Sequence, residues 1–403
     1  MVLLAASVGL AEQITLKYWN WTALEIPGEE ELIRSFETAH PNIKIELVTG
    51  PHFPLRERII SATRAGVGPD VFEFIPEWLV TFVNAGVIAP IDDLLASDKA
   101  VQDRFTAAAW EMGVWRGHAY GLPWRIGPSA MYVNKDMLDA AGLALPKVPW
   151  TWDDLERYAS KLVNRTKGEY GYAFTGAKDS RGTSWEWFAF LFQNGGRMIT
   201  GHEASFNTPA GVEALQFWVD LYRSKQLVPP GTPSLYEKDI VDLMGRGKVA
   251  MWHNGPWFIA QFANYPNAHI ATVPLPQKVT TGSPAGGTLL GISPKSRYKE
   301  AAWEFVKYMT SDEVLGKWAQ LGSFMPTTKA LLARPEYTSG LLAAFTTQLN
   351  LPNTVMLGTN PEIDYLLDVL QAELQRALLG QSSAKDALDR AAKEWNATLA
   401  KYK

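Results

Sequence analysis

Hydrophobic and polar residues alternate or recur at helical spacing through the first hundred positions. Residues 14–20 alternate with Ile14 and Leu16 on one face, and 43–48 alternate likewise, which is the period of β-strands. A third short strand is predicted at 70–74. Apolar residues spaced for helices fill 27–39, 55–66 and 76–86. This β-α-β-α-β-α order predicts a mostly parallel sheet with helices on both faces.

The rest of the chain continues in the same style. Thr151 followed by Asp154 is a capping-box pattern at a helix start. A strand predicted at 247–252 leads to Pro256, which is placed to open another helix. The other predicted helices cover 151–162, 185–196, 207–227, 363–374 and 388–399.

Two stretches, 121–134 and 273–293, mix glycine and proline into strand-like runs. Such segments are typical of crossings between lobes, where the backbone has to bend outside a core. The sequence therefore suggests that the chain passes between two bodies at these points.

Composition narrows the function classes. The 403 residues include no cysteine, which excludes disulfides and thiolate metal sites within the chain. A net charge of -4 without long runs of one sign gives no footprint for nucleic acid or for a polybasic membrane patch. Residues 1–11 resemble the remnant of a signal peptide, too short to span a bilayer. The chain has 16 tryptophans, which suits a protein that stacks flat rings on a ligand.

Aromatic and acidic residues lie at the carboxyl ends of the predicted strands. Ligands bind at these ends in sheets of this kind. Trp19 and Trp21 lie at the carboxyl end of the first strand, and Glu73 and Phe74 at the end of the third. Because ligands sit beyond the carboxyl ends of parallel strands, both loops are expected at one edge of the sheet.

Nine motifs in a fixed order resemble the extracellular solute-binding proteins of ABC importers, family 1, the sugar-binding family that includes maltose-binding protein. They include ITLKYWNW, SFETAHPNIKIELV, GPDVFEF, GHAYGLPWRIGPSAMYVNKDML and GKVAMWHNGPW, and run from about residue 14 to 325. Each motif alone is weak, but their order is specific.

The resemblance implies an α/β, two-lobed periplasmic-binding-protein fold of type II with three interlobe crossings, the third at 322–328. The implied N-terminal lobe is 12–121 plus 277–325, and the C-terminal lobe is 122–276 plus 326–403. It also implies a monomer outside the cytoplasm that binds a carbohydrate and delivers it to a permease. Anchoring through a lipid on a residue outside this chain stays open.

Candidate ligand contacts follow from the family pattern and from the chemistry of sugars, which present flat apolar faces and many hydroxyls. Each has a structural alternative: core packing for the tryptophans, an interlobe salt bridge for Arg125, a helix-dipole interaction for Glu77, and hinge flexibility for the glycines. His52 and Met325 are expected only at the rim. The candidates are Trp19, Trp21, Glu73, Phe74, Glu77, Trp124, Arg125, Trp185, Trp252, Asn254, Trp257, Gly286 and Gly287.

Two competing functions remain open at this point. A glycosidase would use Glu73 and Glu77 as paired carboxylates, although both come from one short loop, whereas such pairs normally flank the bond from two sides. The same fold could instead bind a polyol, sugar acid or sugar phosphate through Arg125 and His52. No phosphate-binding GKS/T loop, zinc-type HExxH or GxSxG elbow is present, which counts against an enzyme. We expect a binding protein that is not an enzyme and that has no cofactor.

Overall fold

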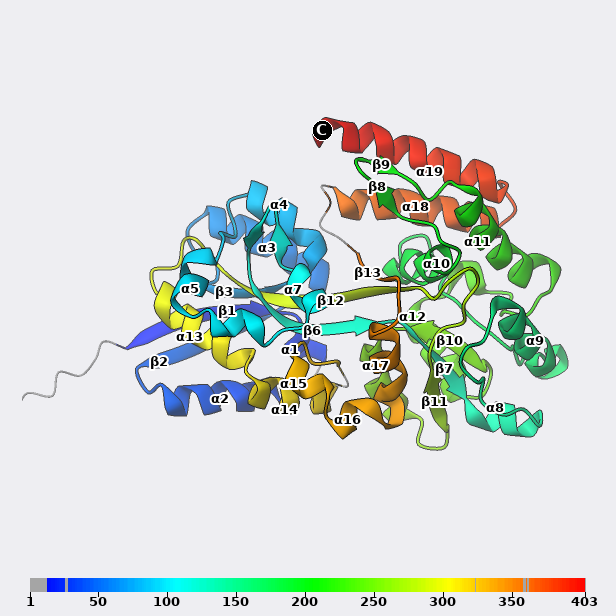
Figure 1. The fold of residues 1–403 in the computed structure, drawn as a ribbon, viewed down its shortest axis with the longest axis horizontal. Coiled ribbons are helices and arrows are strands. Elements are labelled where there is room, and N and C mark those ends of the chain that lie inside the picture. Colours follow the sequence, from blue (N-terminus) through cyan, green and yellow to red (C-terminus); the bar gives the residue numbers. More distant parts are fainter. Residues whose placement is uncertain (1–12, 26–27, 323, 358–359, 361, 403) are drawn as a thin grey trace, which may run out of the picture.

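The computed structural model describes residues 13–25, 28–322, 324–357, 360 and 362–402. Helices and strands gather into two bodies, each around its own sheet (Figure 1). The predicted signal-peptide remnant, 1–11, lies outside the described residues.

The first body is built on a six-stranded sheet of order β13-β12-β3-β1-β2, with β6 paired to β12. Strand β1 (Ile14–Asn20) pairs in parallel with β2 (Ile43–Thr49) and with β3 (Val71–Phe74). The helices between them are α2 (Glu29–Ala39) and α3 (His52–Arg64). These predicted elements are confirmed. The helix predicted at 76–86 begins as the 3₁₀ turn η1 (Pro76–Trp78) and continues as α4 (Leu79–Asn84).

The strands that complete this sheet come from later in the chain. Strand β12 (Ser283–Ile292) runs antiparallel to β3 and to β6 (Leu122–Pro128), and parallel to β13 (Thr354–Met356). The sheet is therefore mixed. Local alternation predicted the parallel strands, but it carries no information on which distant strand pairs with β3.

The second body is built on the three-stranded sheet β10-β7-β11. Strand β7 (Ala130–Asn134) is central and antiparallel to β10 (Met251–Asn254) and β11 (Ile270–Val273). The strand predicted at 247–252 corresponds to β10, which begins and ends later in the sequence than predicted. This sheet shares one hydrophobic core with α9 (Trp152–Leu162), α10 (Arg181–Gln193), α11 (Pro209–Val219), α18 (Ile363–Leu378) and α19 (Ala384–Leu399).

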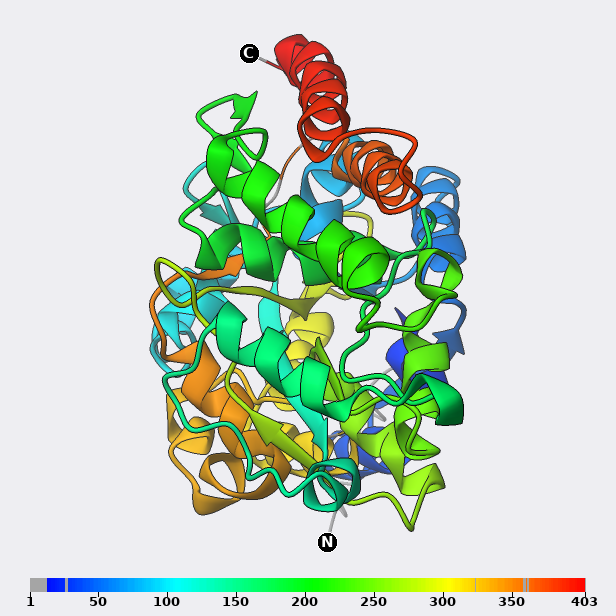
Figure 2. The ribbon, with the colours of Figure 1, turned by 90° about the vertical axis from the view of Figure 1, so that its right-hand side faces the viewer.

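These helices follow their sequence signals. The capping box of α9 is formed, with the Asp154 backbone N–H donating to Thr151 Oγ1 at 3.2 Å and the Thr151 N–H donating to Asp154 Oδ2 at 3.0 Å. The two C-terminal helices, α18 and α19, lie above α10 and α11 (Figure 2). They bury Leu366, Leu370 and Trp395, in agreement with their predicted apolar stripes.

The remaining elements are mostly short helices and two-residue strands, together with the longer helices α13 and α14. In the first hundred and fifty residues these are α1 (Thr22–Glu25), α5 (Asp92–Ser97), α6 (Ala100–Asp103), α7 (Ala107–Glu111), β4 (Val114–Trp115), β5 (His118–Ala119) and α8 (Lys135–Ala140). The middle adds η2 (Arg165–Lys167), β8 (Ile199–Thr200), β9 (Glu203–Ala204), η3 (Asp220–Ser224), η4 (Thr232–Ser234), α12 (Glu237–Gly245) and η5 (Pro256–Asn264). The last part adds α13 (Lys299–Met309), α14 (Asp312–Gly322), α15 (Lys329–Leu332), α16 (Pro335–Thr338), η6 (Gly340–Leu342), α17 (Ala343–Leu349) and η7 (Ala400–Tyr402).

Strands β6 and β7 are separated by one residue, Ser129, yet they belong to different sheets. Strand β6 lies in the six-stranded sheet and β7 in the three-stranded one, so the chain passes from one sheet to the other within 122–134. It passes back between β11 and β12. The exact lobe boundaries stay a prediction.

Candidate ligand-binding site

A cavity of about 720 Å³ is walled by residues from both bodies. From the first body come Trp21, which directly follows β1, the turn η1 and the strands β6 and β12; from the second come α10 and η5. The cavity brings together seven of the predicted site residues: Trp21, Glu77, Arg125, Trp185, Trp257, Gly286 and Gly287. His52, expected at the rim, also lines it.

Two tryptophans form a corner in this cavity. The rings of Trp185 and Trp257 meet edge to face, with centroids 5.5 Å apart and planes inclined by 65°. Trp185 is held by a hydrogen bond from its Nε1 to Ser129 Oγ at 2.7 Å, at the point where the chain changes sheets. Trp257 is placed by the turn from β10 into η5. Both rings are half-buried, so each keeps surface available to a ligand.

Glycines make room for these rings. A Cβ atom on Gly286 would lie 3.1 Å from the ring of Trp185, and one on Gly127 would lie 3.1 Å from the ring of Trp257. A Cβ on Gly287 would come within 2.1 Å of the carbonyl oxygen of its neighbour on β6. The sequence predicted that Gly286 and Gly287 admit a ligand to the backbone. Both glycines line the cavity. Because they have no side chain, the ring of Trp185 can lie beside Gly286 and the paired strand β6 can lie beside Gly287.

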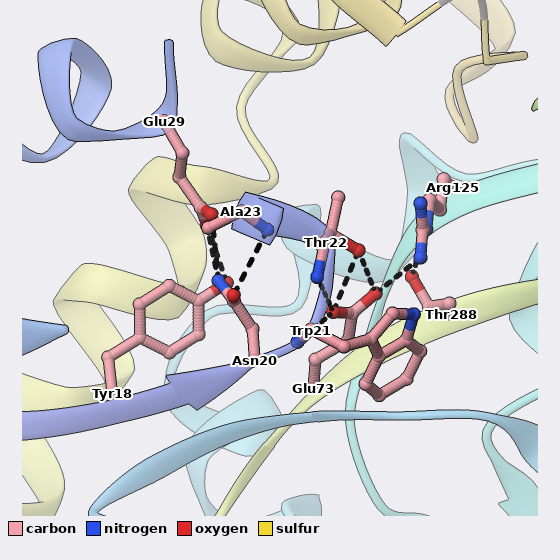
Figure 3. Close-up of polar contacts among 9 residues, drawn as sticks. All are labelled: Tyr18, Asn20, Trp21, Thr22, Ala23, Glu29, Glu73, Arg125 and Thr288. Atoms are coloured by element: carbon pink, nitrogen blue, oxygen red, sulfur yellow. Dashed lines mark hydrogen bonds and ion pairs between the residues drawn. The ribbon is translucent and has the colours of Figure 1, made fainter. Parts of the chain in front are cut away.

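Glu73 joins two cavity residues from behind (Figure 3). Its buried carboxylate accepts hydrogen bonds from Arg125 Nη2 at 2.8 Å, from Thr22 Oγ1 at 2.7 Å, and from the backbone N–H groups of Trp21 and Thr22 at 3.3 and 3.2 Å. Arg125 Nε in turn donates to Thr288 Oγ1 at 3.0 Å. Glu73 is fully buried and does not line the cavity. Its prediction as a ligand contact is therefore corrected: it fixes Trp21 and Arg125.

The guanidinium of Arg125 is also held between aromatic faces. Its Cζ lies 4.3 Å from the centroid of Phe324 and 5.8 Å from that of Trp21. The combination of a carboxylate, a hydroxyl and two rings fixes the plane of the guanidinium before any ligand arrives.

The amide at the end of β1 has a partner as well (Figure 3). Asn20 Nδ2 donates to both carboxylate oxygens of Glu29 at 2.8 Å, and the Tyr18 hydroxyl donates to Glu29 Oε1 at 2.9 Å. Burial raises the pKa of Glu29 from 4.5 to about 8. This buried cluster anchors the segment that carries Trp21.

His52 and Glu77 share one side of the cavity. The ring of His52 lies 4.4 Å from Trp21 and 4.7 Å from Trp78. Burial, with nearby guanidinium groups, lowers the pKa of His52 to about 3, so the imidazole is neutral near pH 7. Burial raises the pKa of Glu77 to about 7. Met325, the other expected rim residue, is fully buried and does not line the cavity.

Two further predicted contacts lie in the core. Trp124 and Arg125 are neighbours on β6, at an irregularity where the pairing with β12 passes from Pro123 to Arg125 and skips Trp124. Arg125 faces the cavity, whereas Trp124 stacks in the core on Trp318, with centroids 5.3 Å apart and planes at 8°. Phe74 is fully buried among core phenylalanines and does not reach the cavity.

Three other predicted contacts also lie outside the cavity. Trp252 Nε1 and Asn254 Nδ2 donate to Glu186 Oε1 at 2.9 and 3.0 Å, inside the second body. Trp19 is buried under Arg58, whose Cζ lies 4.5 Å from the ring centroid. These side chains stabilise the walls, and only Trp21 of the opening aromatic run lines the cavity.

Sequence reasoning missed several lining residues. Three of them, Phe258, Gln261 and Asn264, recur every third position along η5. This period of three is the signal that could have found them, but it places these residues on one face only if a 3₁₀ helix is assumed. The other missed residues are Ile75, Ile126, Gly127, Glu237, Ala260, Thr288 and Phe324.

Among the described residues, no group of three or more histidine, aspartate and glutamate side chains is arranged to hold a metal ion. The groups that line the cavity are suited to stacking and hydrogen bonding. Aromatic faces come from both bodies, and fixed polar groups lie between them. Such a site between two bodies is typical of proteins that enclose a small solute.

Comparison with known proteins agrees with the assignment to the class of proteins that enclose a small solute. Residues 22–315 match the model of the family described as bacterial extracellular solute-binding protein, and the chain belongs to this family. Its two-lobed fold is that of periplasmic solute-binding proteins, as expected from the motifs. A solute-binding protein of Thermotoga lettingae, bound with alpha-D-tagatose, superposes with a TM-score of 0.83 at 27% identity, covering 96% of this chain and 100% of that one.

Two curated relatives show the range of solutes named within this similarity. The arabinooligosaccharide-binding protein of Bacillus subtilis is 25% identical over 353 residues, which is 82% of this chain and 79% of the relative. The sn-glycerol-3-phosphate-binding periplasmic protein UgpB of Shigella dysenteriae is 24% identical over 426 aligned positions, which is 98% of this chain and 95% of the relative.

Proposed function

We propose that this protein is the carbohydrate-binding component of an ABC importer, which encloses a neutral mono- or oligosaccharide between its lobes and delivers it to the permease. The observation that carries the proposal is the corner formed by Trp185 and Trp257, with Trp21 in the same cavity. Tryptophan faces stack on the C–H-rich faces of sugar rings, while fixed polar groups bind the hydroxyls.

The charges of the cavity favour a neutral ligand over an anionic one. Arg125 is paired with Glu73 at 2.8 Å, so its charge is already balanced. His52 is neutral near pH 7, because its pKa is lowered to about 3. Two carboxyl groups, those of Glu77 and Glu237, also line the walls. An anionic ligand would therefore find, among the described residues of the cavity, no cation whose charge is not already balanced. This argues against the sugar-phosphate and sugar-acid alternatives.

The geometry also argues against a glycosidase. Glu73 lies behind the cavity wall, with its carboxylate occupied by Arg125, Thr22 and the backbone of Trp21. It cannot flank a glycosidic bond together with Glu77, as the paired carboxylates of such an enzyme must. We infer binding without chemistry.

The mechanism follows from the site's position between two bodies. On the predicted boundaries, Trp21 and Glu77 belong to the N-terminal lobe, and Trp185 and Trp257 to the C-terminal lobe. A sugar that touches both sets stabilises the closed arrangement, because it binds that arrangement better than the open one. The protein would work as a monomer outside the cytoplasm. Among the described residues, no helix has both the length and the apolarity needed to span a bilayer.

A thermal-shift panel tests the proposal. The purified protein is heated with neutral mono- to tetrasaccharides, with polyols, and with sugar acids and sugar phosphates. A ligand at 100 times its Kd stabilises the folded state by about 2.7 kcal/mol, a readily measured shift. We expect a neutral saccharide to raise the midpoint. A shift only with charged ligands or polyols would overturn the neutral-carbohydrate assignment, and release of shorter sugars on incubation would overturn binding without chemistry.

A further inference from the structure

One wall of the cavity is a 3₁₀ helix, and its surface is divided into three ridges. In η5, residues three apart lie one above the other, since a 3₁₀ helix has three residues per turn. One ridge, which includes Pro256 and Phe262, is buried against the protein. The two other ridges face the cavity through Trp257 and Ala260, and through Phe258, Gln261 and Asn264.

The second of these cavity-facing ridges is a straight row of one aromatic ring followed by two amides. We call Phe258, Gln261 and Asn264 the amide row. At about 2 Å of rise per residue, the row is about 12 Å long, which is roughly the length of two sugar rings joined end to end. It begins beside the tryptophan corner, because Phe258 directly follows Trp257.

The amide row leads from the closed part of the cavity to solvent. Among the lining residues, Trp21, Arg125 and Gly286 are buried, whereas Gln261, Asn264 and Ala260 are exposed. The exposed lining residues thus all belong to η5. A ligand longer than the closed part would therefore extend along this helix.

The two amides are available for a ligand. Within the part of the chain that the structure describes, the side chains of Gln261 and Asn264 make no hydrogen bond to other protein groups. Each presents a carbonyl acceptor and an NH₂ donor in one plane, a pattern that matches neighbouring hydroxyls on a sugar ring. Neither carries a charge, in agreement with a neutral ligand.

We propose that the amide row is an extension subsite, which binds the third and fourth units of an oligosaccharide whose first units stack in the tryptophan corner. The proposal rests on the proposed function and specifies it further. The natural ligand is an oligosaccharide, and contacts along η5 make the affinity depend on the number of its sugar units. Phe258 packs against a ring face, and Gln261 and Asn264 exchange hydrogen bonds with its hydroxyls.

Two saccharide ladders test this subsite by isothermal titration calorimetry: arabinose to arabinotetraose, and glucose to maltotetraose. The variants are Gln261→Ala, Asn264→Ala and the double substitution. The control is Asn267→Ala, an exposed asparagine three residues beyond Asn264 that lies outside this cavity. Since the substituted residues are exposed, melting without ligand should not change and reports that each variant folds.

In at least one ladder, the unsubstituted protein should bind the tetrasaccharide more tightly than the disaccharide. The double variant should lose about tenfold in affinity for the tetrasaccharide and less than twofold for the disaccharide, as expected for one or two hydrogen bonds. The control should lose neither. Equal affinities for two and four units, or an equal loss at both lengths, would overturn the subsite and leave the proposed function intact. Binding of no saccharide from either ladder or from the neutral panel would overturn both.

Discussion

The guanidinium of Arg56 lies 2.7 Å from the carboxylate of Asp364, and this ion pair joins α3 of the first body to α18 of the second. The side chains are only 18% and 20% exposed, so the pair is partly shielded from solvent. Arg181 approaches the same carboxylate at 3.5 Å from the start of α10. On the predicted boundaries, Arg56 and Asp364 belong to opposite lobes, so their attraction favours the closed arrangement.

Substitution of Arg56 should therefore weaken ligand binding without a ligand contact being lost. In Arg56→Ala we expect a two- to tenfold rise in the Kd for the best saccharide of the panel, in line with about 1 kcal/mol for a partly buried pair. The loss should shrink at high salt, because salt screens the pair in the unsubstituted protein. Calorimetry at low and high ionic strength measures both effects. Arg64→Ala, an exposed arginine on the same helix, is the control; an equal effect there would show that the pair has no special role.

The tryptophan corner should dominate the affinity. Trp185→Ala and Trp257→Ala each remove a stacking face, and truncation of a buried aromatic contact costs about 2 kcal/mol or more, roughly a thirtyfold loss. Quenching of tryptophan fluorescence or calorimetry measures the Kd. Trp115→Ala provides a matched control, because that ring is half-buried on β4 and does not line the cavity. Unchanged affinity in both corner variants would contradict the assignment of this cavity as the site.

Glu73 should matter for stability as well as for binding. In Glu73→Gln the buried Arg125 loses its counter-charge at 2.8 Å, and breaking a buried pair on one side costs about 3 kcal/mol or more. Urea denaturation should show this loss.

A double variant separates the two roles of Glu73. Glu73→Gln combined with Arg125→Met removes both charges, so stability should largely return, whereas saccharide affinity should stay low because Arg125 lines the cavity. If the double variant were as unstable as the single one, the ion pair would not be the cause of the loss.

Buried Glu29 should make stability fall as pH rises. Its pKa is about 8 in the folded protein, above its ordinary value of 4.5, so between these values the folded protein keeps a proton that the unfolded chain releases. The free energy of unfolding then decreases with pH, by up to about 1.4 kcal/mol per pH unit from this group. Glu29→Gln keeps an acceptor for Asn20 but cannot ionise. Its stability between pH 5 and 8 should decline less steeply than that of the unsubstituted protein, as measured by urea denaturation; parallel pH profiles would contradict this account.

The sequence by itself determined the elements and much of their order. Alternation at 14–20 and 43–48 and helical spacing at 27–39 and 55–66 show which residues of one segment share an apolar face. This is a local property of each segment. The same holds for the capping box at Thr151. The rule that strand ends carry ligand residues placed Trp21 at the cavity before any distance was known.

Only the tertiary structure decided which side chains face the ligand cavity. Trp124 and Arg125 are adjacent on β6, and the sequence cannot tell which face of that strand is covered by Trp318 and which is left open. Glu73 lies behind the cavity wall, where its carboxylate accepts hydrogen bonds from Arg125 and Thr22, which belong to other segments of the chain. The amide row became visible only once η5 proved to be a 3₁₀ helix. The physical reason is common to all three: periodicity fixes which residues share a face, whereas the burial of a face depends on contacts between segments far apart in the chain.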